Sequence, residues 1–402
     1  AMQTDTVACW DAILDRVRIE TPDPAVREIF YSCLYHSLIK PIRAPGESPW
    51  WPGDTPFCCD FTTLWDMHKT QLPLVFTLCP DVGAEIVESM LSTMETHGRM
   101  PTALLLSGNL DRCSQQGPAL GHHVLFDAWV RGIQGDWPRA VELMAETLGW
   151  GKAEAFVREG VIKPYSHILD LASSAHATAV MAAALGRDRI AGRMAGLAKT
   201  WRNAFDPSTA RLRADSKYYE GSLWNYSFRP LPEMEERIGM YHDRAAFVAD
   251  LDRFFGYAAL AEGTVEAEPE PSEWRRLEQP DTFEGLNNES DMESPYAYIY
   301  AGRHDRTAEI VRAVMKYQFT AGAGGLPGND DSGGLSSWYV WNAMGLYPAT
   351  GQDLVFIGSP ALRGAQIDMP GGTLQIRALN QSAAHTCVRR ALLNGREIVG
   401  MR

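Results

Sequence analysis

Two adjacent carboxylates, Asp330 and Asp331, stand on a glycine-rich turn before an aromatic helical pattern, where they could act in acid–base chemistry. The stretch 324–348 reads GGLPGNDDSGGLSSWYVWNAMGLYP, and its glycines allow positive φ angles and a close approach of the backbone to a ligand. The same two residues could instead cap the following helix, because aspartate at a helix N-terminus accepts hydrogen bonds from free amide groups. The pattern supports both interpretations.

A second candidate is Glu220, which lies in the aromatic stretch YYEGSLWNY at residues 218–226. We expect partial burial against aromatic rings, which would raise the pKa of the carboxyl group and keep it protonated near neutral pH. A protonated carboxyl group can donate a proton to a leaving group. The alternative is a surface glutamate beside aromatic residues of the core.

A third candidate is the loop at residues 283–295, FEGLNNESDMESP, which combines four acids with two asparagine amides. Oxygen ligands at this density suit calcium, although the spacing is not that of an EF-hand. The alternative is a solvated acidic loop.

A fourth candidate is the pair Trp65 and Asp66, in the segment CDFTTLWDMH at residues 59–68. An aromatic ring beside a carboxylate can hold a sugar by stacking and by hydrogen bonds to hydroxyl groups. A core tryptophan next to a helix-capping aspartate would have the same pattern.

A fifth candidate is His122, which stands between Gly121 and His123 at the start of a predicted helix. An isolated histidine pair in that position is more typical of a structural role than of a binding site.

Amphipathic helices at the 3.6-residue period must position these groups. The sequence predicts helices over Val7–Val17, Pro24–Leu38, Val82–His97, His122–Ile133, Ala140–Leu148, His167–Ala184, Asp188–Phe205, Ala245–Ala261, Asp305–Tyr317 and Ser336–Gly345. Their number and the unequal loops between them favour a mainly α fold, an (α/α)6 toroid of paired helices, over a uniform helical solenoid.

After Pro348 the sequence changes to short alternating runs, which predict strands. They cover Leu354–Ile357, Ala365–Met369, Thr373–Ala378 and Cys387–Leu393. These strands are too few for a self-contained sandwich, so we expect a partner sheet outside this sequence. We therefore expect a toroidal domain with the catalytic candidates at residues 1–350 and an incomplete β-rich segment at 351–402.

The composition argues against several classes of protein. The 402 residues carry a formal net charge of -13, and no run of Lys and Arg supplies the cationic surface that nucleic acids require. No apolar run approaches the ~20 residues that span a bilayer, so we expect a soluble protein without a membrane partner. Seven cysteines without a CxxC pair do not indicate a zinc site.

Together these motifs resemble those of glycoside hydrolase family 92, the calcium-dependent exo-acting α-mannosidases. The family signature GNDD-x-G-x-x-S-x-W-Y-V matches residues 328–340 at every fixed position, and Y-x-E-G-x-x-W-x-Y matches residues 218–226. Further family elements are similar to Leu64–Asp66, Gly121–His122, Asn288–Tyr296, Ile357–Pro360 and Leu393–Gly395. The resemblance covers nearly the whole chain, in the order of the family.

The resemblance implies an inverting hydrolase that releases a terminal α-linked mannose from a glycan. Glu220 would be the general acid, Asp331 the general base, and Asp330 a residue that positions the water or the base. Inversion requires acid and base carboxyl groups on opposite faces of the sugar, ~6.5 to 9.5 Å apart, and two separate loops permit that gap.

The resemblance also implies a calcium ion and a set of groups that bind the substrate. The implied calcium ligands are Asn225, Asn288 and Glu289. Trp65 and Asp66 would hold the terminal sugar. Further substrate contacts are expected from His122, Trp224, Asp291 and Glu293.

The chain departs from the family pattern at two places in the site. Asn225 stands where the family often has the longer Gln, and the loop at residues 288–293 lacks the histidine associated with the leaving-group sugar. The linkage and the sugar are therefore open, and the alternatives are another α-linked sugar or a non-catalytic sugar-binding scaffold. We also expect an N-terminal β-sandwich domain as a partner outside this sequence, and a secreted or periplasmic location, with a cytoplasmic one as the alternative.

Overall fold

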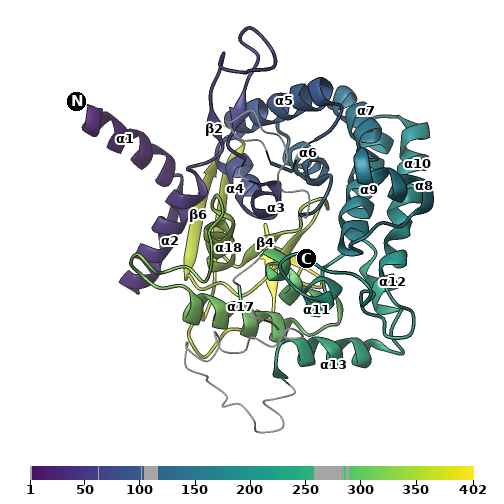
Figure 1. Ribbon diagram of the computed structural model, residues 1–402. Coiled ribbons are helices and arrows are strands. Elements are labelled where there is room, and N and C mark those ends of the chain that lie inside the picture. Colours follow the sequence, from purple (N-terminus) through teal and green to yellow (C-terminus); the bar gives the residue numbers. More distant parts are fainter. Residues whose placement is uncertain are drawn as a thin grey trace.

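A computed structural model describes residues 2–61, 63–100, 102–103, 116–257, 283, 285–286 and 289–402 of the chain. Helices follow one another around a ring, from α2 through α5, α9 and α13 to α17 (Figure 1). The helix α18 then packs against both α17 and α2. The fold is the predicted one, a mainly α (α/α)6 toroid followed by a small β segment.

The described helices are short or of medium length. In chain order, with 3-10 helices labelled η, they are α1 (Met2–Leu14), α2 (Pro24–Ser37), α3 (Leu64–Met67), α4 (Gln71–Leu78), α5 (Pro80–His97), α6 (Leu120–Val130), α7 (Trp137–Thr147), η1 (Gly151–Ala153), α8 (Glu154–Glu159), α9 (Ser166–Ala184), α10 (Asp188–Ala198), η2 (Lys199–Ala204), α11 (Leu223–Ser227), α12 (Met234–Ile238), α13 (Arg244–Phe254), η3 (Glu289–Asp291), η4 (Ser294–Tyr296), α16 (Ala297–Tyr300), α17 (His304–Gln318) and α18 (Gly334–Ala343). Within the described residues, none of them has the length and apolar character needed to cross a bilayer.

Local sequence signals account for where α2 begins. The carboxylate of Asp23 caps α2 by accepting the amide N–H of Ala25 at 2.9 Å, and Pro24 occupies the first helical position. The apolar face of α2 turns Phe30 and Leu34 into the core. In contrast, every residue of α18 is buried, so this helix is a central element that presents its N-terminus inside the toroid.

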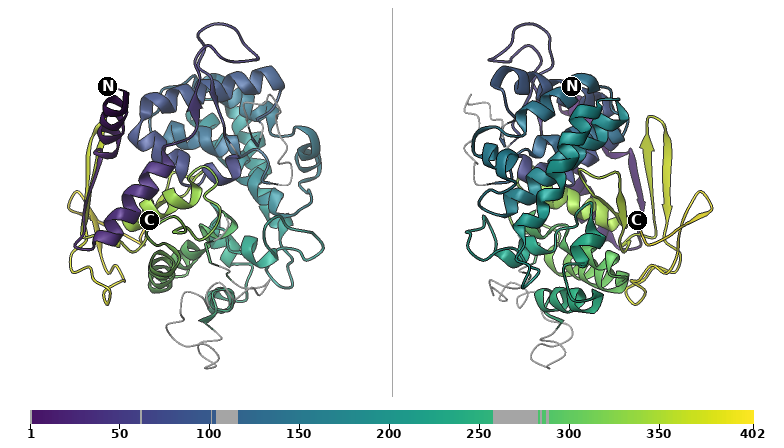
Figure 2. Two further views of the ribbon diagram at one scale, coloured as in Figure 1. Left: turned by 60° about the vertical axis from the view of Figure 1, so that its left-hand side comes forward. Right: turned by 90° about the vertical axis from the view of Figure 1, so that its right-hand side faces the viewer.

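The strands form small antiparallel sheets. They are β1 (Val17–Glu20), β2 (Ile42–Arg43), β3 (Cys58–Cys59), β4 (Leu346–Pro348), β5 (Val355–Ile357), β6 (Gly364–Met369), β7 (Gly372–Arg377), β8 (Ala391–Leu393) and β9 (Arg396–Ile398). The largest sheet has the order β1-β6-β7, and the remaining strands pair as hairpin arms, β2 with β3, β4 with β5 and β8 with β9. Figure 2 shows the late strands gathered on one side of the helices.

The sequence analysis missed β1, as well as the short strands β2, β3, β4 and β9. The helix predicted over Val7–Val17 ends at Leu14, and Val17–Glu20 pairs with β6 in the register Val17 with Ile367 and Glu20 with Gly364. The alternating burial of β1 fits a half-buried strand, but four residues next to a helical pattern are too few for the period-2 signal to stand out. The predicted β-rich segment at 351–402 therefore pairs with the start of the chain.

Three other predicted elements are shorter than expected. The strand predicted over Cys387–Leu393 is limited to Ala391–Leu393, and the helix over Asp188–Phe205 continues after Ala198 only as the 3-10 helix η2. The helix predicted over Ala245–Ala261 ends at Phe254, and its last predicted residues lie outside the described part of the chain.

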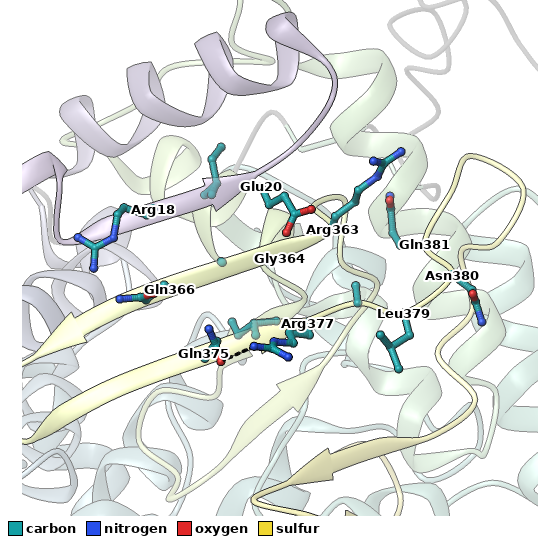
Figure 3. Close-up of a pocket in the computed structure, with 14 residues that line it drawn as sticks. Arg18, Glu20, Arg363, Gly364, Gln366, Gln375, Arg377, Leu379, Asn380 and Gln381 are labelled. Carbon is teal, nitrogen blue, oxygen red and sulfur yellow. Dashed lines mark hydrogen bonds between the residues drawn. The ribbon is translucent and has the colours of Figure 1, made fainter.

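An open polar groove lies over the β1-β6-β7 sheet (Figure 3). Its lining includes Arg18, Gln375 and Arg377, and the guanidinium of Arg377 donates to the amide oxygen of Gln375 at 3.1 Å. Arg18 pairs with Asp368 on the neighbouring strand. Because these side chains keep much of their contact with solvent, their charges are screened, unlike those inside the toroid.

Candidate active site

Three carboxylates that are far apart in the sequence meet inside the toroid. Asp66, Glu289 and Asp331 each offer one oxygen, and these oxygens all lie within 4.8 Å of one another. They come from α3, from η3 and from the turn that precedes α18. We call these three residues the carboxylate cluster. The two buried members are Asp66 and Glu289, whereas Asp331 is exposed.

The start of α3 positions Asp66. The hydroxyl of Thr63 caps this helix by accepting the amide N–H of Trp65 at 2.9 Å. Asp66 lies in the first turn and is only 2% exposed. A Cβ atom at Gly334 would lie 2.8 Å from the carbonyl oxygen of Asp66, so only glycine lets α18 begin this close to α3. Gly334, at a variable position of the signature, therefore lets the turn with Asp331 lie close to Asp66.

The two aspartates of the GNDD turn have different surroundings. Asp330 caps α18, because its carboxylate accepts the amide N–H and the hydroxyl of Ser336, each at 2.8 Å. Asp331 and Ser332 have φ angles of 39° and 72°, in the left-handed region, and Asp331 directs its carboxylate to the cluster. The capping interpretation thus describes Asp330, and the interpretation as a functional turn remains for Asp331.

The carboxylate cluster is electrostatically unbalanced. Burial, followed by the proximity of Glu289 and Asp331, raises the pKa of Asp66 well above its usual range. Burial also raises the pKa of Glu289. The pKa of Asp331 is raised by partial burial and by Asp330, and Lys40 opposes this shift.

The same cluster offers ligands for a hard cation. Oδ2 of Asp66 is buried and has no hydrogen-bond partner among the described residues, which is costly for a carboxylate oxygen. Several carboxylate oxygens aimed at one point are the donors that calcium prefers. A cation would offset the repulsion between the three carboxylates and would give Oδ2 of Asp66 a partner.

Glu220 lies on a strained turn beside the cluster. Its φ angle is 48°, which is uncommon for a glutamate and places it among residues that functional sites often hold in unfavourable conformations. The hydroxyl of Ser290, in η3, donates to the carbonyl oxygen of Glu220 at 3.3 Å, so the turn of Glu220 adjoins that of Glu289.

The predicted partial burial of Glu220 is wrong, because the side chain is exposed. The rings of Tyr218 and Tyr226 instead pack against each other, with centroids 5.7 Å apart. Sequence spacing could not show that these aromatic rings pack against each other while the side chain of Glu220 stays exposed.

The side-chain amide of Asn225 forms hydrogen bonds with Ser222 and Asp291 rather than with the carboxylate cluster. Its carbonyl oxygen accepts the amide N–H and the hydroxyl of Ser222, at 2.7 and 3.2 Å, in a capping box that starts α11. Its NH2 group donates to both carboxylate oxygens of Asp291, at 3.2 and 3.0 Å. These bonds use the acceptor and donor capacity of the amide, so they do not support the predicted metal ligation by Asn225.

The remaining residues of the acidic loop also pair within the protein. Asp291 is 1% exposed and accepts from Asn225, and the carboxylate of Glu293 pairs with Lys69 at 3.2 Å and with Arg229 at 3.1 Å. These contacts give both acids an internal role, and the predicted substrate contacts stay predictions. The third predicted calcium ligand, Asn288, lies outside the described residues.

The two predicted ring contacts away from α3 lie in packed surroundings. His122 is buried, and its Nε2–H donates to the carbonyl oxygen of Met144 on α7 at 2.8 Å. Burial lowers the pKa of His122 to about 4, so the ring is neutral. The ring of Trp224 is buried and lies against the guanidinium of Arg211, at 4.3 Å. Both rings thus have partners within the protein, and their predicted substrate contacts stay predictions.

Trp65, in contrast, stays next to the site. The residue is 2% exposed, its ring centroid lies 6.1 Å from that of Tyr226, and its Nε1–H has no partner within the described residues. The ammonium of Lys69 lies 5.3 Å from the ring centroid. Sequence reasoning missed Lys69, although a lysine directly after LWDMH in a buried segment was a usable signal.

The chain matches a family model over nearly its whole length. The model, described as the glycosyl hydrolase family 92 catalytic domain, covers residues 1–401. Among curated proteins, a fungal protein from Arthroderma benhamiae, described as an uncharacterized secreted glycosidase, is 22% identical over 448 residues. That match covers 98% of this chain and 54% of the relative.

Solved structures share the fold. A family GH92 α-mannosidase from Bacteroides thetaiotaomicron is 22% identical and superposes with a TM-score of 0.84 over 97% of this chain and 55% of its own. A family GH92 inverting mannosidase from the same organism is 25% identical, with a TM-score of 0.82 over 97% of this chain and 58% of its own. The chain thus spans somewhat more than half the length of the relatives that it matches.

Proposed function

The chain belongs to glycoside hydrolase family 92, and we propose that it is an exo-acting, inverting glycosidase that removes a terminal α-linked mannose from a glycan. The family match supports hydrolysis of a glycosidic bond. The names of the two bacterial neighbours, an α-mannosidase and an inverting mannosidase, support the sugar and the stereochemistry. The description of the fungal relative as secreted supports a secreted or periplasmic location.

Glu220 is the proposed general acid and Asp331 the proposed general base. Asp331 is the exposed member of the carboxylate cluster, and its raised pKa makes it a stronger base than an ordinary aspartate. Glu220 stands on a separate turn, which η3 links to the cluster through Ser290. Acid and base on two turns, with a sugar and a water between them, suit an inverting mechanism.

Asp330 holds the base in place. Its two bonds to Ser336 fix the start of α18 and therefore the turn that carries Asp331. Asp330 thus contributes through rigidity, and its carboxylate need not transfer a proton.

Asp66 and Glu289 would hold a calcium ion, with Asp331 in reach of the same point. The fit rests on the orphaned Oδ2 of Asp66 and on the all-oxygen donor set. When bound, calcium would compensate the buried negative charge and polarise hydroxyl groups of the sugar. Glu289 keeps its predicted role in this proposal, and Asp66 takes the place predicted for Asn225.

The observation that carries the proposal is the meeting of Asp66, Glu289 and Asp331 from three distant segments, next to the strained turn of Glu220. Buried like charges are costly, and such an arrangement is typical of functional sites. Its members come from the same motifs that match the family signature.

The test is hydrolysis of 4-nitrophenyl α-mannoside and of α-mannobioses, with the anomer of the product followed by proton NMR. We expect release of β-mannose, loss of activity with EDTA, and a loss of at least ~100-fold in kcat/KM for mannobiose in Glu220→Gln. A retained anomer contradicts inversion, and full activity of Glu220→Gln contradicts the acid assignment. A panel of other α-linked aryl glycosides identifies a different sugar if mannosides are inert.

A further inference from the structure

Four side chains of alternating charge, three of them buried and one partly exposed, lie beside the carboxylate cluster. Lys69 pairs with Glu293 at 3.2 Å, Glu293 with Arg229 at 3.1 Å, and Arg229 with Asp170. Their side chains are exposed by 3, 13, 9 and 1%, in that order. We call these four residues the charge chain. Two cations and two anions balance within it, so it needs no ligand to be neutral.

Lys69 is the member of the charge chain that touches the carboxylate cluster. Its ammonium donates to the backbone carbonyl oxygen of Glu289 at 2.6 Å, in addition to its ion pair with Glu293. A buried ammonium is costly unless its donors are used, so its placement is fixed by these partners. The contact therefore ties the backbone of Glu289 to the segment that carries Lys69.

That segment also carries Asp66. Lys69 follows Asp66 by three residues, and the hydroxyl of Thr350 holds the carbonyl oxygen of Lys69 at 2.9 Å. One short segment thus supplies a carboxylate of the cluster and the cation that anchors the neighbouring carboxylate. The carboxylates of Asp66 and Glu289 repel each other, and without this link their two segments could move apart. The contact of Lys69 keeps them together.

We propose that Lys69 is a positioning residue that holds the Glu289 carboxylate in the carboxylate cluster, with Glu293 as the anion that keeps the ammonium in place. The role of the cluster rests on the proposed function, whereas the role of Lys69 in fixing the Glu289 turn does not. Lys69 itself transfers no proton, because its ammonium bonds to the backbone oxygen of Glu289 and pairs with Glu293.

The experiment compares Lys69→Met and Glu293→Gln with the wild type. Lys69→Met keeps the length of the side chain and removes its charge and donors, whereas Glu293→Gln weakens the anchor of the ammonium. Lys69→Arg restores a charged donor, and Lys163→Met removes an exposed lysine that pairs with Asp215. The readouts are hydrogen–deuterium exchange of peptides spanning 286–296, calcium affinity by calorimetry with CaCl2 alone, and the kcat and KM values for α-mannobiose.

We expect Lys69→Met to accelerate exchange in 286–296 at least several-fold, to leave exchange in α10 unchanged, and to weaken calcium binding by ~10–100-fold, the usual effect of losing a group that orients a ligand. Glu293→Gln should also accelerate exchange in 286–296 and weaken calcium binding, each by a smaller factor. Lys69→Arg should recover most of the calcium affinity, and Lys163→Met should match the wild type.

Unchanged exchange in 286–296 in both Lys69→Met and Glu293→Gln overturns the proposal. Equal acceleration of exchange across all helices overturns it too, because that result indicates a general loss of stability. If Lys69→Met does not fold, Glu293→Gln and Lys69→Arg decide the question. A wild-type protein that binds no calcium and cleaves no mannoside contradicts the proposed function, and the exchange data then decide the role of Lys69 by themselves.

Discussion

The carboxylate cluster and the charge chain are neighbouring buried regions with opposite charge balance. In the charge chain each anion has a cation beside it, whereas Asp66 and Glu289 face a third carboxylate. Burial disfavours the charged guanidinium of Arg229, but Asp170 and Glu293 outweigh it and raise the pKa of this residue. For Asp66 burial and its neighbours act in the same direction.

This difference separates a region whose charges are paired within the protein from a region whose negative charges are not. A balanced set of buried charges is satisfied by folding alone, although it adds little net stability. An unbalanced set persists only if the rest of the fold enforces it, and it binds protons or a cation in return. The comparison therefore assigns structure to the charge chain and function to the carboxylate cluster, and four experiments can break or sharpen it.

The largest effect is expected from breaking the balanced region. Arg229→Met leaves Asp170 and Glu293 buried without that partner, which should cost about 3–5 kcal/mol in the free energy of unfolding. Chemical denaturation in urea measures this loss. The matched control is Arg18→Met, which removes an exposed partner of Asp368, with side chains 50 and 40% exposed, and should cost about 0–1 kcal/mol. Equal effects at both positions would contradict the structural role of the charge chain.

The next effect comes from filling the unbalanced region. Calcium at 100 times its dissociation constant should raise the free energy of unfolding by about 2.7 kcal/mol, because it binds the folded chain. Thermal denaturation with CaCl2 and with EDTA measures the difference. Asp66→Asn should remove most of it, because this substitution deletes a buried carboxylate of the cluster. Persistence of the full calcium effect in Asp66→Asn would place the ion elsewhere.

The pH dependence of stability without calcium provides a third experiment. The pKa values of Asp66, Glu289 and Asp331 are raised by folding, so the folded state binds more protons than the unfolded state above pH ~4. Their contribution to stability is therefore retained at pH 4 and falls as the pH rises toward the folded pKa values. We expect Asp66→Asn in EDTA to lose less stability than the wild type between pH 4.5 and 7.5.

The comparison with the wild type matters here because other acids act in the opposite direction. Hydrogen bonds from Arg303, for example, lower the pKa of Asp305, so its contribution grows with pH. Urea denaturation at several pH values gives the slope of the free energy of unfolding against pH for the wild type and for Asp66→Asn. A wild-type slope no steeper than that of Asp66→Asn would contradict the imbalance of the cluster.

Motif chemistry predicted the cluster better than its surroundings. The turn with Asp330 and Asp331 and the acidic loop with Glu289 were singled out from residue type and local spacing, because glycine turns and oxygen-rich loops are local signals, whereas the roles of Asp331 and Glu289 came from the family resemblance. The charge chain could not be predicted, since Lys69, Glu293 and Asp170 are separated by long stretches and meet only through packing. The exposure of Glu220 and the pairing of β1 with β6 are likewise set by tertiary contacts.

The smallest effect distinguishes the two adjacent aspartates of the GNDD turn. Asp330→Ala removes the acceptor for the amide and hydroxyl of Ser336 and should cost about 0.5–2 kcal/mol, the usual effect of losing a helix cap. Asp330→Asn retains an acceptor, so its free energy of unfolding should fall by only a few tenths of a kcal/mol. Asp331→Asn should leave stability equal or higher, because it relieves repulsion in the cluster, while kcat for mannoside hydrolysis falls.

Thermal denaturation and kinetics on the three variants give the answer. A stability loss in Asp331→Asn as large as that in Asp330→Ala would mean that both residues cap α18, and the cluster would then lose its base. We expect the Asp330 variants to lose stability and the Asp331 variant to lose activity. This result would show that the two adjacent aspartates differ because hydrogen bonds to the protein satisfy the charge of Asp330 only.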